Sequence, residues 1–126
     1  MKEEKGNILF VEDDPFLVDI YSTALRKEGF NVEIAKNGNE CLSKLQKEKP
    51  DLLLLDIVLP QMNGWEVLRK IKEDEQLKDL KIIILSNLGE KEEVEKGFAL
   101  GVKMYLIKSH YTPKQVVEKI KKVLKQ

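Results

Sequence analysis

Carboxylates follow two of the most apolar segments of the chain, and they are the first candidates for chemistry. Asp56 comes directly after the apolar run 52–55, and the acidic cluster Glu12, Asp13 and Asp14 follows the apolar run 8–11. A carboxylate inside a buried strand is costly. We therefore expect Asp56 at the carboxyl end of its strand, where the chain opens to solvent. Two strands that both end in carboxylates indicate one acidic pocket.

Such a pocket favours a divalent cation and phosphoryl chemistry. Carboxylates that lie close together repel one another and raise their own pKa values unless a cation offsets them. Mg²⁺ commonly takes one or two carboxylates together with waters and a phosphate oxygen, and an aspartate can itself be the nucleophile that forms an acyl-phosphate. Phosphoryl transfer also needs positive charge and hydrogen-bond donors. Lys108 and the Ser86 hydroxyl, which follow two later apolar runs, supply them.

Strand-like and helix-like segments alternate along the whole chain. Short apolar runs predict strands at 8–11, 32–35, 52–55, 82–85 and 104–107, and helical spacing of apolar residues predicts a helix after each of them. Five βα units imply a parallel sheet with helices on both faces and right-handed crossovers. In such sheets the ligand site lies beyond the carboxyl ends of the strands. These ends carry Glu12 and Asp13, Ala35, Asp56, Ser86 and Lys108.

Composition limits the class of protein. The 126 residues fit a single domain, 1–126, and 42% hydrophobic with 35% charged residues indicates a globular chain rather than a disordered or membrane one. Twenty-two basic residues balance twenty-two acidic ones, so we expect no direct nucleic acid binding. The charged residues 1–5 predict no signal peptide. Cys41 is the only cysteine and is interpreted as a buried hydrophobe. We expect a cytoplasmic protein with no membrane contact.

Four motifs together carry a family resemblance. They are Ile-Leu-Phe-Val-Glu-Asp-Asp-Pro at 8–15, Asp-Ile-Val-Leu-Pro-Gln-Met-Asn-Gly at 56–64, Ile-Ile-Leu-Ser at 83–86 and Tyr-Leu-Ile-Lys at 105–108. With these motifs in this order, the chain resembles the receiver domain of bacterial two-component response regulators. The resemblance covers nearly its whole length. The resemblance implies a doubly wound, flavodoxin-like (βα)5 fold with strand order 2-1-3-4-5.

The resemblance also assigns roles to site residues. It implies that Asp56 is the phosphoacceptor, Ser86 the switch hydroxyl, Tyr105 the switch aromatic and Lys108 the phosphate-binding lysine. The implied ligands of Mg²⁺, with Mn²⁺ as the alternative ion, are Glu12, Asp13, Asp56 and the main-chain carbonyl of Val58. Asp13 is the more direct ligand of the acidic pair. Two variable positions that control the lifetime of the phosphoryl group in this family correspond to Val58 and Leu88, both apolar here.

The implied partners follow from the same resemblance. The phosphoryl donor is a phosphohistidine on a sensor histidine kinase or a histidine phosphotransfer domain. The output is a downstream protein or a homodimer, bound through the fourth helix, the fifth strand and the fifth helix. We expect a signalling domain rather than an enzyme, since it catalyses only its own phosphoryl transfer and dephosphorylation.

The chain departs from the family pattern at three positions. Ser109 stands where receivers usually carry proline after the lysine, so a cis peptide bond is not expected there. Asn87 replaces a small residue after Ser86, where its amide would crowd the phosphate or add a donor. Asp14 is a third acid, interpreted as a helix N-cap because Pro15 then occupies the first helical position.

Three other functions compete with this interpretation. A flavin-binding protein of the same fold class needs a loop rich in Ser, Thr or Gly after the first strand, but here that loop is acidic. A phosphatase of the haloacid dehalogenase type wants a second Asp two residues after the nucleophile, where Val58 stands. No P-loop or dinucleotide glycine motif is present. A degenerate receiver that acts as a phosphorylation-independent docking module stays open as the alternative.

Overall fold

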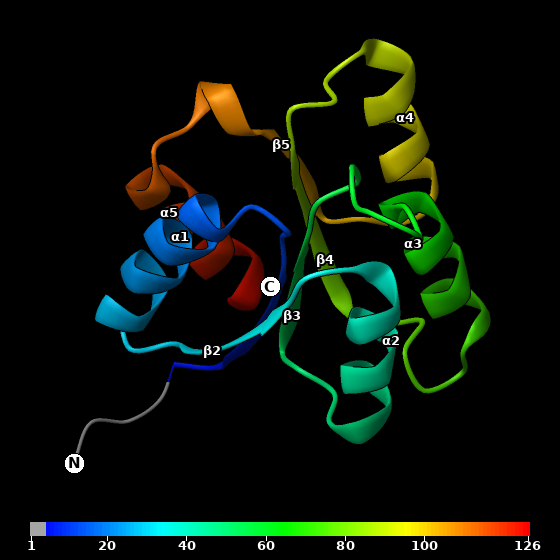
Figure 1. The fold of residues 1–126 in the computed structure, drawn as a ribbon, viewed down its shortest axis with the longest axis horizontal. Coiled ribbons are helices and arrows are strands. Elements are labelled where there is room, and N and C mark those ends of the chain that lie inside the picture. Colours follow the sequence, from blue (N-terminus) through cyan, green and yellow to red (C-terminus); the bar gives the residue numbers. More distant parts are fainter. Residues whose placement is uncertain (1–4) are drawn as a thin grey trace.

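The computed structural model describes residues 5–126. Residues 1–4, on which most of the expectation about a signal peptide rests, lie outside the described residues. Five strands form one parallel sheet, and in sequence order they are β1 (Asn7–Val11), β2 (Asn31–Ala35), β3 (Leu52–Leu55), β4 (Lys81–Ser86) and β5 (Met104–Ile107). Their order across the sheet is β2-β1-β3-β4-β5, so the expected doubly wound, flavodoxin-like topology is confirmed (Figure 1).

Helices cover both faces of the sheet. They are α1 (Pro15–Lys27), α2 (Gly38–Lys47), α3 (Gly64–Glu73), α4 (Lys91–Ala99) and α5 (Pro113–Leu124), with a short 3₁₀ helix, η1 (Lys108–His110), before the last. Helices α1 and α5 lie on one face, and α2, α3 and α4 lie on the other (Figure 1). Within residues 5–126, no helix combines the length and the apolar character needed to cross a membrane.

Strand β3 explains why the run 52–55 is entirely apolar. All four of its leucines are fully buried, and successive side chains of a strand point to opposite faces. Leu52 and Leu54 join the core beneath α1 and α5, whereas Leu53 and Leu55 join the core beneath α2, α3 and α4. A central strand covered on both faces has no solvent-facing position, which is typical of parallel sheets.

Polar side chains cap the amino ends of four of the described helices. Asp14 accepts a hydrogen bond from the Phe16 N–H, which confirms its expected role as the N-cap of α1. Asn37 and Asn63 cap α2 and α3 in the same way. Thr112 caps α5 in a reciprocal capping box whose second member, Gln115, the sequence analysis did not single out.

Cys41 lies in α2 with no exposed surface. Burial raises the pKa of its thiol to about 12, so the thiol stays protonated at neutral pH. The interpretation of Cys41 as a buried hydrophobe is confirmed.

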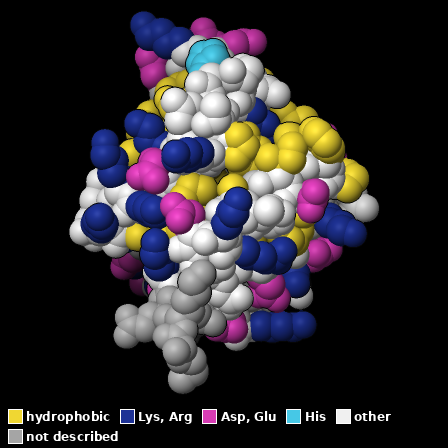
Figure 2. Space-filling view, turned by 90° about the vertical axis from the view of Figure 1, so that its left-hand side faces the viewer, with side chains coloured by type: hydrophobic (Ala, Val, Ile, Leu, Met, Phe, Trp, Pro, Cys, Tyr) yellow, Lys and Arg dark blue, Asp and Glu magenta, His cyan; other side chains and the backbone are white. Residues whose placement is uncertain are grey.

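The side of the molecule on which α1 and α5 lie carries many basic residues, but they are not gathered into one patch. Figure 2 shows Lys and Arg side chains spread over this side with acidic side chains between them. Lys121 of α5, for example, contacts Glu28 at the end of α1 at 2.8 Å and Glu118 at 3.6 Å. The lysines of α5 therefore belong to a mixed, solvated surface.

Candidate functional site

A cavity of about 370 Å³ opens at the carboxyl ends of the strands. Besides Leu17, its lining consists of residues singled out from the sequence: Glu12, Asp13, Asp14, Asp56, Val58, Ser86, Asn87 and Lys108. Tyr105 and Leu88 are not in this lining. Four of the five strand ends contribute to the cavity, because adjacent parallel strands end at one edge of the sheet.

Three carboxylates gather in this cavity. Glu12, Asp13 and Asp56 each offer an oxygen, and these oxygens lie within 4.8 Å of one another. Asp13 is exposed, but Glu12 and Asp56 are only 1% and 4% exposed. Asp56 directly follows β3 and lines the cavity, as expected of a residue at the carboxyl end of its strand, but its side chain is buried. A neighbouring lysine offsets part of the cost of burying it.

Lys108 is that lysine. Its Nζ lies 2.7 Å from Asp56 Oδ2 and 2.6 Å from Glu12 Oε1, and its side chain is itself largely buried. The first contact is a hydrogen bond, and the second is an ion pair without hydrogen-bond geometry. The second Glu12 oxygen accepts from the Asp14 N–H at 3.1 Å.

The pKa values in this cluster reflect burial and charge in competition. Burial raises the pKa of the Glu12 carboxyl, although Lys108 and the Asp14 N–H oppose the shift. Desolvation lowers the pKa of Lys108, but its contacts with Asp56 and Glu12 together outweigh it and leave the pKa above the usual lysine value. Lys108 is therefore a fixed positive charge at neutral pH.

The chain after Asp56 is held close to the start of α3. The Gly64 N–H donates to the Ile57 carbonyl at 2.8 Å, and a Cβ at Gly64 would lie 2.6 Å from the Asp56 carbonyl oxygen. Only glycine permits this approach. The Val58 N–H donates to Asp56 Oδ1 at 3.2 Å, while the Val58 side chain is 63% exposed at the rim of the cavity. The metal contact of the Val58 carbonyl stays a prediction.

Ser86 and Tyr105, the two candidate switch residues, share a partner that the sequence did not reveal. The Ser86 hydroxyl oxygen accepts from the Leu88 N–H at 3.3 Å, and the Tyr105 hydroxyl donates to the Leu88 carbonyl. Tyr105 is only 8% exposed, so its ring already lies inward. Burial, followed by the charges of Glu93 and Asp56, raises the pKa of Tyr105 to about 12 and keeps the donor proton in place. Both contacts are made by the backbone of Leu88, so the residue type at position 88 could not predict them.

The loop after β5 differs from a proline-containing one as expected. The described residues contain no cis peptide bond, and Lys108, Ser109 and His110 form the short helix η1. The Ser109 N–H donates to the Asn87 side-chain oxygen at 3.1 Å. His110 is exposed, as expected of a solvated loop residue.

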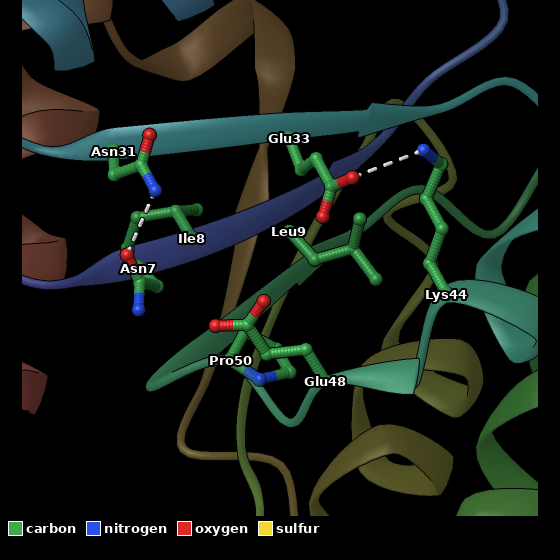
Figure 3. A pocket seen from close by; sticks show the side chains of 8 residues that line it. All are labelled: Asn7, Ile8, Leu9, Asn31, Glu33, Lys44, Glu48 and Pro50. Carbon is green, nitrogen blue, oxygen red and sulfur yellow. Dashed lines mark hydrogen bonds and ion pairs between the residues drawn. The ribbon is translucent and has the colours of Figure 1, made fainter. Parts of the chain in front are cut away.

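A second, smaller cavity lies near the amino ends of β1 and β2 (Figure 3). Its volume of about 30 Å³ leaves room for roughly two water molecules. Its main polar side chains pair with each other: Lys44 with Glu33 at 3.2 Å, and Asn31 with Asn7 at 3.0 Å. It lies away from the edge where ligands bind in sheets of this kind, so we assign it no function.

The fold and the acidic site place the molecule in a class of known proteins. Five parallel strands in the order 2-1-3-4-5 with five helices form the flavodoxin-like fold of chemotaxis-type receivers. Residues 8–121 match the family described as the response regulator receiver domain, and the chain belongs to this family.

Individual relatives agree with this membership. The chain is 32% identical over 126 residues to the DNA-binding response regulator MtrA of Mycolicibacterium smegmatis, covering 100% of this chain and 54% of that protein. It is similar to the Vibrio cholerae chemotaxis response regulator CheY4, with a TM-score of 0.85 and 28% identity over 93% of this chain and 97% of that one. The phosphorylated cyanobacterial phytochrome response regulator RcpA gives a TM-score of 0.81 and 28% identity, over 94% and 90% of the two chains. The chain spans about half the length of the curated relatives that it matches.

These relatives correct one expectation about partners. The sequence analysis excluded direct nucleic acid binding, yet the matched relatives include a response regulator described as DNA-binding. That exclusion is wrong. It rested on the balanced net charge of one domain, and such a balance does not describe the partners of the larger proteins in which this domain occurs.

Replacing Lys108 by methionine should destabilise the protein. The substitution leaves Glu12 and Asp56 buried without their cation, so we expect the free energy of unfolding at pH 7 to fall by about 1–3 kcal/mol, less than for a fully buried pair because the cavity is open. Urea denaturation measures the change. Lys121→Met, which removes the partly exposed ion pairs with Glu28 and Glu118, is the matched control and should change stability less. Equal losses in the two variants would contradict this role of Lys108.

Proposed function

We propose that this chain is a phospho-accepting receiver that takes a phosphoryl group onto Asp56 from a phosphohistidine of a sensor kinase or phosphotransfer domain. The observation that carries the proposal is the contact of Lys108 with Asp56 in a cavity that also holds Glu12 and Asp13. A nucleophile, a positive charge and a set of metal-binding oxygens thus lie together, as phosphoryl transfer to a carboxylate requires.

The acidic cluster fits a hard divalent cation, which we propose to be Mg²⁺ with Mn²⁺ as the alternative. Three carboxylates face one lysine, so the cavity keeps an excess of negative charge. Oxygen ligands of this kind suit Mg²⁺. We propose Asp13 as the direct ligand from the acidic pair, because it is exposed and not paired with Lys108 among the described residues. When bound, the ion would neutralise charge on phosphoryl oxygens.

The chain's own residues divide the remaining work. An Asp56 oxygen forms the new bond to phosphorus while the bond from phosphorus to the donor nitrogen breaks. Lys108, which holds Asp56 at 2.7 Å, is placed to pair with the incoming phosphoryl oxygens. The Ser86 hydroxyl lines the same cavity and can donate to another of these oxygens.

The degenerate receiver is the less favoured alternative. A docking module that does not accept phosphate has no need to bury Glu12 and Asp56 against one lysine, an arrangement that costs desolvation energy. We propose that residues 1–126 form a single receiver domain that works in the cytoplasm and acts catalytically only on its own phosphoryl group.

Phosphorylation of Asp56 is the first test. With Mg²⁺ and acetyl phosphate, intact-mass measurement should show a gain of one phosphoryl group, and Asp56→Asn should abolish it. Asp13→Asn should weaken Mg²⁺ binding and slow the reaction. Asp14→Asn is the matched control, since asparagine keeps the cap of α1, and it should still be labelled. Unchanged labelling of Asp56→Asn would refute the assignment of the phosphoacceptor.

We further propose that phosphorylation is read out through Ser86 and Tyr105. Both contact the backbone of Leu88, so a hydroxyl that turns from the Leu88 N–H toward a phosphoryl oxygen removes one of the bonds that hold this segment. Such a change favours one of two packings around Tyr105. The inward ring in this structure is one of them.

The phosphate mimic beryllofluoride should therefore shift the amide resonances of Ser86, Leu88 and Tyr105 in NMR spectra. Amides near the amino ends of the strands, such as that of Asn31, are the internal control and should move little. If the resonances around Ser86 and Tyr105 stayed in place while the mimic bound, the switch would be refuted.

The rim of the cavity bears on the lifetime of the acyl-phosphate. Water must attack in line, and an apolar side chain such as Val58 cannot hold that water by hydrogen bonding. The structure supports this role for Val58, whose exposed side chain lines the cavity. Leu88 packs against the core instead of lining the cavity, so its proposed contribution to shielding is the smaller one.

We expect the phosphorylated state to live longer than in fast chemotaxis-type receivers. Val58→Asn should speed the decay of the Asp56 phosphate several-fold, because one water-orienting hydrogen bond is worth about 1 kcal/mol. Leu88→Glu should speed it less. Val58→Leu keeps the rim apolar and serves as the control with unchanged decay. The decay is followed by intact mass after the phosphodonor is removed. Equal or slower decay in Val58→Asn would contradict the argument.

A further inference from the structure

Two of the three residues that depart from the family pattern are bonded to each other. Asn87 follows Ser86 directly, Ser109 follows Lys108 directly, and the Ser109 N–H donates to Asn87 Oδ1 at 3.1 Å. The backbone ladder between β4 and β5 ends with Ser86 opposite Ile107. The Asn87–Ser109 bond is thus a further link between the two chain segments, beyond the last pair of the ladder.

This bond requires both departures at once. Proline at position 109 would have no N–H to donate, and alanine at position 87 would have no side-chain acceptor. The trans peptide bond between Lys108 and Ser109 and the turn of η1 place the Ser109 N–H in the required position. The hydrogen bond therefore needs both a side-chain acceptor at position 87 and a residue other than proline at position 109.

Oδ1 is the only hydrogen-bond acceptor atom of the Asn87 side chain, and the bond from Ser109 takes one of its two lone pairs. Asn87 lines the cavity beside Asp56. A water that attacks the acyl-phosphate is oriented by giving its protons to an acceptor, as the carbonyl of an amide can do. Because the Ser109 N–H holds Oδ1 toward η1, the Asn87 carbonyl is not free to turn toward such a water, although this bond fills only one of its two lone pairs.

We propose that Asn87 and Ser109 form a latch that joins the Ser86 and Lys108 loops and slows loss of the phosphoryl group by withholding the Asn87 carbonyl from the attacking water. Both are positioning residues. The effect on lifetime rests on the proposed function at Asp56, whereas the bond itself does not. The chemical step is hydrolysis: a water oxygen bonds to phosphorus, the bond from phosphorus to the Asp56 oxygen breaks, and the water proton leaves to an acceptor.

The bond is tested first in the unphosphorylated protein. Hydrogen exchange of the Ser109 amide, followed by NMR, should be several-fold faster in Asn87→Ala than in the wild type, because the amide loses its acceptor. Ser109→Ala keeps the N–H and is the matched control, so the amide of residue 109 should stay as protected as in the wild type. Equal exchange in the wild type and Asn87→Ala would overturn the latch.

The effect on lifetime is tested by a double-mutant cycle. Ser109→Pro removes the donor and frees the Asn87 carbonyl, so the Asp56 phosphate should decay about fivefold faster. The same proline in the Asn87→Ala background should have no such effect, and Ser109→Ala should decay like the wild type. An equal acceleration in both backgrounds, or none in Ser109→Pro, would overturn the proposal. Absence of any labelling at Asp56 would overturn the proposed function and the lifetime effect together, while the exchange experiment still decides the bond.

Discussion

The contact of one lysine with two buried carboxylates is the constraint on which the site depends. Strands β1 and β3 are neighbours, so Glu12 and Asp56 meet at the edge of the sheet. Lys108 follows β5, two strands away from β3, and adjacent strands lie about 4.8 Å apart. Only a long, flexible side chain spans that distance, and it passes the end of β4, where Ser86 lies. The strand order therefore places both the positively charged Lys108 and the Ser86 hydroxyl close to the two buried acids.

The same arrangement leaves the site with a net negative charge. One lysine compensates the two acids that are buried, while Asp13 remains exposed beside them. A site with three carboxylates and one fixed cation retains negative charge, which attracts a divalent ion and repels a bare phosphate. For the proposed phosphoryl acceptor, this net charge would favour entry of a phosphoryl group together with a metal ion rather than alone.

Much of this arrangement follows from the sequence, and the exceptions share a physical cause. The strands 52–55 and 104–107 were predicted with the bounds that the structure shows, because short apolar runs that end at charged residues are typical of buried strands. The strand-end residues were expected together because a parallel sheet brings strand ends to one edge, and Glu12, Asp13, Asp56, Ser86 and Lys108 do line one cavity. The burial of Asp56, the Leu88 backbone as a shared partner and the Asn87–Ser109 bond were not predicted. Each depends on contacts between distant segments that residue type and spacing do not encode. The exclusion of nucleic acid failed because composition describes one domain and not its assemblies.

The site residues fall into two groups by their position in the fold. Glu12, Asp56 and Ser86 end or directly follow strands of the buried sheet, so their positions are fixed by the core and changing them costs stability. Val58, Asn87 and Ser109 are exposed and lie outside the strands. Surface substitutions of this kind usually change stability little. We therefore propose that the rate of phosphoryl loss can be altered at these positions while the chemistry at Asp56 stays intact. Under the proposed latch, the pair Asn87 and Ser109 would adjust the lifetime of the phosphoryl group and would not mark a decayed site.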